Sequence, residues 1–117
     1  MPENYRLARE EEMQRNVERM DRARKAERDA LATVRHFNAR LSAGRVVWSW
    51  PKIAAALTSG HHWISILCEG CGTIGDLDLR IKSRDPEASI RVVLRDAQCS
   101  RCYCMTRQRI VGLRKVP

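Results

Sequence analysis

Residues 68–71 read CEGC, and residues 99–102 read CSRC. These two C-x-x-C pairs decide the fold, because each tight loop presents two sulfurs close together on one side of a tetrahedral ion. Cys68, Cys71, Cys99 and Cys102 are therefore predicted to bind one structural Zn²⁺. Four protein ligands close the coordination shell, so no position is left for a water molecule or a substrate.

Other uses of the four thiols stay open at this point. A redox dithiol usually needs one C-x-x-C pair at the N-terminus of a helix, whereas this chain has two pairs in Gly-bearing or polar turns. An iron or iron–sulfur centre can use the same four thiolates. Zinc is the preferred interpretation, because it is the metal that this spacing most often holds.

Further residues of metal-binding type lie near the two loops. Cys104 extends the second loop to C-x-x-C-x-C and is interpreted as a free, partly buried thiol. The alternatives are that it replaces Cys102 as a ligand or serves as an oxidation-sensitive spare. His61 and His62 precede Cys68 by six or seven residues and are interpreted as turn or surface residues, since four cysteines already suffice.

The chain of 117 residues divides by composition into two parts. Residues 1–42 carry 10 of the 22 basic and 8 of the 14 acidic residues, which predicts a charged helical arm over residues 1–43. Residues 44–117 must then form the folded domain. A domain of this size rarely buries enough apolar surface to fold without a staple, and a structural metal is one such staple.

The arm is predicted to be one helix over residues 3–42, because Pro and Gly are absent from this segment and Gly44 follows it. Its apolar 4-3 repeat is interrupted by three polar residues, and it consists of Met13, Val17, Met20, Leu31, Val34 and Leu41. We expect a mostly exposed helix whose last two turns dock on the domain through Leu31, Val34, Phe37 and Leu41. Self-pairing as a coiled coil and a frayed start up to Glu12 are the alternatives.

The second part is predicted to be an α+β, zinc-ribbon-like domain of three antiparallel strands and two short helices. The expected helices cover residues 52–58, with Pro51 as the first helical residue, and residues 86–96, after the start signal Asp85-Pro86-Glu87. The expected strands cover residues 63–67, 73–81 and 105–116, where apolar and β-branched residues recur. Trp63 is expected to pack in the core.

A formal net charge of +8 favours an anionic partner, because a basic surface attracts nucleic acid or anionic lipid. Arg101 lies in the second cysteine loop, and Arg107 and Arg109 fall on one face of the last predicted strand, so these three are candidate nucleic-acid-binding residues. A solvated face on a basic protein is the alternative. Three tryptophans in apolar surroundings are too few to indicate a base-stacking platform.

The sequence lacks the residue patterns that are typical of several classes of function. Paired carboxylates, a nucleophile with its base, and a phosphate-cradling glycine loop are all missing, so we expect no enzyme. No run of eighteen apolar residues occurs, and the first thirty residues resemble neither a signal peptide nor an import peptide, so we expect a cytoplasmic protein without membrane contact.

From about residue 48 to 112 the chain resembles a group of small, uncharacterised α-proteobacterial zinc-ribbon-like proteins. The resemblance rests on a combination of motifs: IAAALTSG (53–60), HWISILCEGCGT (62–73), DLDLR (76–80), DPEASI (85–90) and CSRC (99–102). It departs from that group at Glu69, where Pro is common, at Cys104 and in the charged arm. The resemblance implies the same four metal ligands and implies no function.

These observations favour a non-enzymatic zinc-binding module that binds nucleic acid through a basic surface. The alternative is a protein-interaction or assembly factor that pairs with a partner, or with itself, through the N-terminal helix. A thiol redox protein that uses Cys99, Cys102 and Cys104 is the third and weakest interpretation.

Overall fold

The computed structural model describes residues 3–81 and 84–117 and has the α+β fold that the sequence predicts. One long helix, α1 (Glu3–Ser42), precedes a small module made of α2 (Ile53–Thr58), three strands and a short helical run. The strands are β1 (Trp63–Cys68), β2 (Ile74–Asp78) and β3 (Gln108–Arg114), and the helical run consists of the 3₁₀ turn η1 (Ile90–Val92) and α3 (Val93–Asp96). Among the described residues, no helix combines the length and the apolar character needed to cross a membrane.

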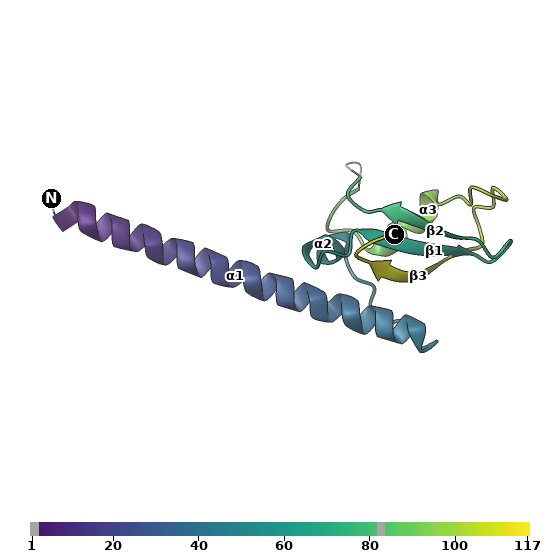
Figure 1. Ribbon diagram of the computed structural model, residues 1–117, viewed down its shortest axis with the longest axis horizontal. Coiled ribbons are helices and arrows are strands. Elements are labelled where there is room, and N and C mark those ends of the chain that lie inside the picture. Colours follow the sequence, from purple (N-terminus) through teal and green to yellow (C-terminus); the bar gives the residue numbers. More distant parts are fainter. Residues whose placement is uncertain (1–2, 82–83) are drawn as a thin grey trace.

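Helix α1 is a single rod whose C-terminal turns lie beside the sheet, while its N-terminal part projects past the module (Figure 1). Its 40 residues span about 60 Å at the rise of an α-helix. Ala30, Val34 and Phe37 are buried against the module, and Leu41 packs at the edge of the same cluster. The predicted docking of the last turns is confirmed. The helix ends at Ser42, and Gly44, the predicted stop, follows it with a φ of 67° that suits glycine.

The sheet has the order β2-β1-β3, and both pairings are antiparallel. The central strand β1 is buried along Ile64, Ser65 and Ile66. A β-bulge interrupts its pairing with β3, because Ser65 faces Gly112 while Ile66 faces Ile110. Strand β3 is an edge of this sheet, and α1 lies against it (Figure 1).

Helix α1 also covers part of that edge with a side chain. The Asn38 amide nitrogen donates to the Leu113 carbonyl at 2.9 Å, and the Leu113 N–H donates to the Asn38 amide oxygen at 2.9 Å. The side chain of Asn38 therefore pairs with β3 as a neighbouring strand would. This explains why a polar residue interrupts the apolar repeat of the helix.

The predicted helix over residues 86–96 is wrong in its first half. Asp85 accepts a hydrogen bond from the Glu87 N–H, as in a turn, and the helical run begins only at Ile90, with Ser89 as its N-cap. The carbonyls of residues 86 and 88 accept from the first two N–H groups of α2 at 2.8 and 2.9 Å. These contacts hold residues 85–88 in a turn that caps α2 instead of beginning a helix of its own.

Other boundaries also differ from the predictions. Pro51 precedes the N-cap Lys52 of α2 and so lies outside the helix. Strand β2 ends at Asp78, because the Asp78 carboxylate accepts from the Arg80 N–H and side chain and turns the chain. Strand β3 begins at Gln108 rather than at residue 105, because the preceding residues belong to the second cysteine loop.

The core lies between the sheet, the end of α1 and the helical run. It contains one contiguous cluster of buried residues: Val34, Phe37, Ile53, Ala56, Ile64, Ile66, Leu79, Ile90, Val93, Ala97, Ile110 and Leu113. Trp50 packs against this cluster with its ring 5.3 Å from that of Phe37. Trp63, which was expected in the core, is only half-buried, and the Arg80 guanidinium lies 5.8 Å from its ring centre.

Candidate metal centre

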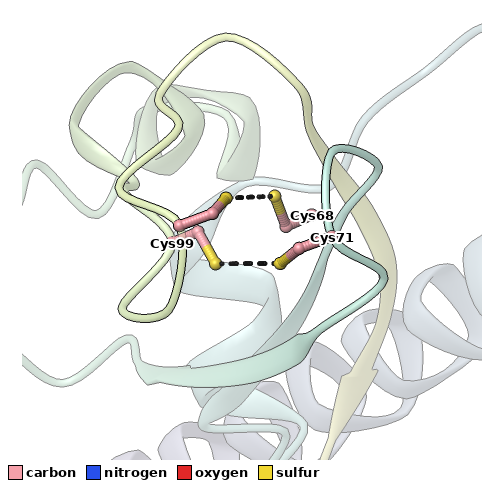
Figure 2. Close-up of side chains that lie close together, drawn as sticks. Cys68, Cys71 and Cys99 are labelled. Atoms are coloured by element: carbon pink, nitrogen blue, oxygen red, sulfur yellow. Dashed lines mark hydrogen bonds between the residues drawn. The ribbon is translucent and has the colours of Figure 1, made fainter.

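The four cysteines named from the sequence lie together at one end of the sheet. Their sulfur atoms are all within 4.8 Å of one another. Cys68 is the last residue of β1 and faces Cys102, with 3.5 Å between the sulfurs, and Cys71 lies 3.5 Å from the sulfur of Cys99 (Figure 2). Each of these close pairs joins one loop to the other. The four thiols can therefore hold a single metal ion between the loops.

The two cysteine loops have the same backbone structure. In residues 68–73 and 99–104, the N–H of the first cysteine donates to the carbonyl five residues later, at 2.9 and 3.0 Å. The carbonyl of the same cysteine accepts from the N–H four residues later, at 2.7 and 2.9 Å. Both turns thus bring their two sulfurs to one side, as a tetrahedral site requires.

The residue after each second cysteine adopts a left-handed conformation. Gly72 has a φ of 75°, and Tyr103, at the equivalent place in the second loop, has a φ of 60°. This conformation costs a residue with a side chain about 1–2 kcal/mol. The second loop therefore holds Tyr103 in a strained conformation that the first loop avoids with glycine.

Replacing Gly72 with alanine should destabilise the protein by about 1 kcal/mol. A Cβ at Gly72 would meet no atom within 4 Å, so the cost comes from φ alone. Gly75→Ala is the matched control, because a Cβ there also meets nothing within 4 Å and its φ is ordinary. Urea denaturation of both variants measures the difference, and equal stabilities would contradict the assignment of strain to φ.

Hydrogen bonds around the first loop favour the ionised thiolates that a metal needs. The hydroxyl and N–H of Thr73, together with the thiol of Cys99, lower the pKa of Cys71 to about 6. Burial alone raises the pKa of Cys68. Hydrogen bonds from the Cys71 N–H and the Cys102 thiol outweigh burial, so that the pKa of Cys68 is lowered.

Cys102 shows the opposite behaviour. The N–H of Cys104 lowers its pKa, but its contacts with the other three sulfurs, together with desolvation, outweigh this effect and raise the pKa to about 12. Sulfurs this close repel one another when all are ionised. A bound metal cation would remove that repulsion by taking the place of the thiol protons. The cluster therefore suits a metal ion.

The site has a buried side and an exposed side. Cys68 and Cys99 are buried, whereas Cys71 and Cys102 are exposed at the surface of their loops. The N–H of Glu69 donates to the Arg107 carbonyl at 2.8 Å, which ties the first loop to the segment before β3. The sulfur cluster and this backbone hydrogen bond therefore hold the two loops together at one end of the sheet.

The other candidate ligands lie outside the cluster. The sulfur of Cys104 lies 3.8 Å from the Thr106 hydroxyl, while Cys102 occupies the fourth place in the metal cluster. His61 is buried, its Nδ1 is hydrogen-bonded to the Ser59 hydroxyl at 2.9 Å, and burial lowers its pKa. The assignment of Cys102 rather than Cys104 to the cluster agrees with the sequence analysis.

The three candidate arginines lie on segments next to the cluster. Arg101 lies in the second loop, and its N–H points at the Cys99 sulfur, 3.4 Å away. Arg109 forms an ion pair with Glu69 of the first loop, with 3.3 Å between the nitrogen and the oxygen. The Arg107 side chain passes Gly70 of the same loop. All three side chains are exposed.

Sequence reasoning missed two groups that contact the site. The Thr73 hydroxyl lies 3.1 Å from the Cys71 sulfur. The Gln108 side chain donates to the Cys104 carbonyl at 3.0 Å, and its hydrogen bond to the Cys68 sulfur helps to lower the pKa of Cys68. Thr73 is five residues after the first cysteine of its loop, as Cys104 is in the second loop. This shared spacing was the available signal for Thr73.

Comparisons with protein-family models, with curated proteins and with solved structures found no match. The resemblance to small α-proteobacterial zinc-ribbon-like proteins therefore stays a prediction.

Proposed function

We propose that this protein is a non-enzymatic binding module, stapled by one structural Zn²⁺, that binds nucleic acid through the basic surface around the metal. The observation that carries the proposal is the clustering of four thiols beside three exposed arginines: Arg101 in the second loop, Arg107 before β3 and Arg109 within β3.

Zinc is proposed because the donor set and its spacing suit this ion. A Zn–S bond of about 2.3 Å places tetrahedral sulfurs about 3.8 Å apart, and the closest sulfurs here are 3.5 Å apart. Four thiolates form a closed shell of soft ligands, which is typical of structural rather than catalytic zinc. Thiolate ligands also need a reducing compartment, which fits a cytoplasmic location.

Nucleic acid is proposed because the surface around the metal carries positive charge. The chain has a formal charge of +8, and four thiolates with one Zn²⁺ change it by −2, to +6. Arginine is the side chain best suited to phosphate, because its planar guanidinium donates two parallel hydrogen bonds. Glu69 neutralises part of Arg109, so Arg101 and Arg107 carry most of the proposed attraction.

The proposal predicts that duplex DNA binding depends steeply on salt and on these arginines. Replacing Arg101, Arg107 and Arg109 together with alanine should make the slope of log affinity against log salt less negative by about 1.8 to 2.7, because each phosphate contact contributes about 0.9 and Glu69 already neutralises part of Arg109. Fluorescence anisotropy of a labelled duplex at several salt concentrations measures both slopes.

A matched variant distinguishes the effect of these three arginines from the effect of the overall net charge. Arg9, Arg15 and Arg19 are exposed on the projecting part of α1, and replacing them with alanine removes the same charge. This control should keep the wild-type slope. Equal slopes for all three proteins, or no duplex binding by the wild type, would count against the proposal.

An assembly role for α1 is the second candidate function, and one observation favours it. Five large apolar side chains are exposed on the projecting helix: Tyr5, Leu7, Met13, Val17 and Met20. Met13, Val17 and Met20 follow a 4-3 spacing that suits helix pairing. Sedimentation of the metal-bound protein tests this role, since pairing through α1 gives a mass above 13.5 kDa that Met13→Glu with Met20→Glu would return to the monomer.

A further inference from the structure

We propose that a groove formed by the linker before α2 and the helical run η1–α3 binds single-stranded nucleic acid, with an unpaired base stacked on Trp48 and phosphates held by Arg91 and Arg95. This inference rests on the proposed function and adds to it a second surface, which recognises single strands.

The groove is built by backbone contacts between two distant segments. Lys52 and Ser89 form an isolated antiparallel bridge, and the Ile90 N–H donates to the Pro51 carbonyl at 2.9 Å. These contacts place the linker beside the helical run. The space between them measures about 790 Å³ and is lined by Trp48, Ser49, Trp50, Ser89, Arg91, Val92, Leu94 and Arg95.

Trp48 is the free aromatic ring of this groove. Its side chain is 85% exposed, the highest value among the large apolar residues of the described chain. Trp50 is already engaged, because Phe37 lies 5.3 Å from its ring and the Arg91 guanidinium lies 5.2 Å from its ring centre. An exposed indole offers a flat apolar face, and a nucleic-acid base is a partner of matching size and flatness.

Arg91 and Arg95 supply positive charge on the same side. They are four residues apart on the helical run, so they share one face, and both are exposed. The stacking of Arg91 on Trp50 fixes the guanidinium as a flat, charged surface. Among the described residues that line the groove, none is acidic, so the charge is not neutralised within it.

This combination of groups favours an unpaired strand over other ligands. Base faces are accessible for stacking on an indole only where the strand is single, because a duplex buries them. An apolar peptide would cover Trp48 but leave two guanidiniums without partners. An unpaired nucleotide segment satisfies both kinds of group, since it alternates aromatic faces with phosphates. From the sequence, three tryptophans in apolar surroundings were too few to indicate a base-stacking platform, but Trp48 is exposed because no other segment of the described chain packs over it.

The test is binding of fluorescein-labelled oligothymidylate and oligouridylate, measured by anisotropy on the metal-bound protein. Trp48→Ala should weaken binding of both oligonucleotides by about tenfold, as expected for the loss of one stacked base. Trp48→Phe keeps an aromatic face and should retain most of the affinity, whereas Trp48→Leu, which keeps only apolar area, should resemble alanine. Because Trp48 is exposed, none of these changes should unfold the chain.

The contribution of Arg91 and Arg95 is measured separately, through the salt dependence of binding. Replacing Arg91 and Arg95 with alanine should make the salt slope for the single strand less negative by about 1.4, because each contact contributes about 0.7. Arg15→Ala with Arg19→Ala, on the projecting part of α1, removes the same charge and should leave the slope unchanged.

The outcomes separate this inference from the proposed function. Loss of single-strand affinity in Trp48→Ala with duplex binding preserved supports the groove. Wild-type affinity of Trp48→Ala for both oligonucleotides overturns the groove, and the proposed function then stands if Arg101, Arg107 and Arg109 still control duplex binding. Absence of binding to any oligonucleotide overturns both.

Discussion

Cys68→Ser should lose the bound metal and the cooperative unfolding transition of the sheet module. Structural zinc in small domains binds with an apparent free energy of about 10–16 kcal/mol, which is comparable to or larger than the stability of most small proteins, about 5–15 kcal/mol. Cys68 ends β1 and lies buried at the contact between the two loops. Native mass spectrometry measures the metal content, and near-ultraviolet circular dichroism measures the tertiary packing.

Cys104→Ser is the matched control for this prediction. Cys104 lies two residues after a cluster cysteine but outside the cluster, so its replacement should keep one metal per chain and near-wild-type stability. A chelator added to the wild type should reproduce the loss seen in Cys68→Ser. A folded, metal-free Cys68→Ser protein would show that the four thiols do not staple the fold.

Phe37→Ala should destabilise the metal-bound protein by about 3–5 kcal/mol. Phe37 is 2% exposed and packs on Trp50 within the one core cluster, so its removal leaves a cavity where α1 meets the module. Chemical denaturation in the presence of excess metal measures the change without loss of the ion.

Met20→Ala on the same helix is the control for Phe37. Met20 is exposed, and its replacement should change the stability by less than about 0.5 kcal/mol. Equal effects of the two substitutions would mean that α1 does not form part of the core. The pair therefore tests whether the helix is a structural element of the domain or only an appendage to it.

The sequence predicted those parts of the fold that depend on local signals. The long helix followed from its composition and from Gly44, and the three strands followed from their apolar residues. The four-cysteine cluster followed from the spacing of the two C-x-x-C pairs. In these segments the local preference and the tertiary fold agree, which is why a single sequence was enough.

The parts that sequence reasoning missed depend on contacts between distant segments. The signal Asp85-Pro86-Glu87 is a normal helix start, but the carbonyls of residues 86 and 88 cap α2 instead. The exposure of Trp48 and the half-burial of Trp63 likewise depend on which segments pack against them. Such choices are made by tertiary structure, and local propensity is a weak guide to them.

The pairing of Asn38 with Leu113 has a consequence for how the chain folds. The two residues are 75 positions apart, and β3 must also find β1 across a long stretch of chain before the edge exists for Asn38 to meet. Contacts of such long range are formed late and slow the folding of a small protein. The helix can coil early by itself, but the pairing of Asn38 with β3 must wait for the last strand. Refolding kinetics of this chain should therefore show fast helix formation followed by a slower, concerted closure of the sheet.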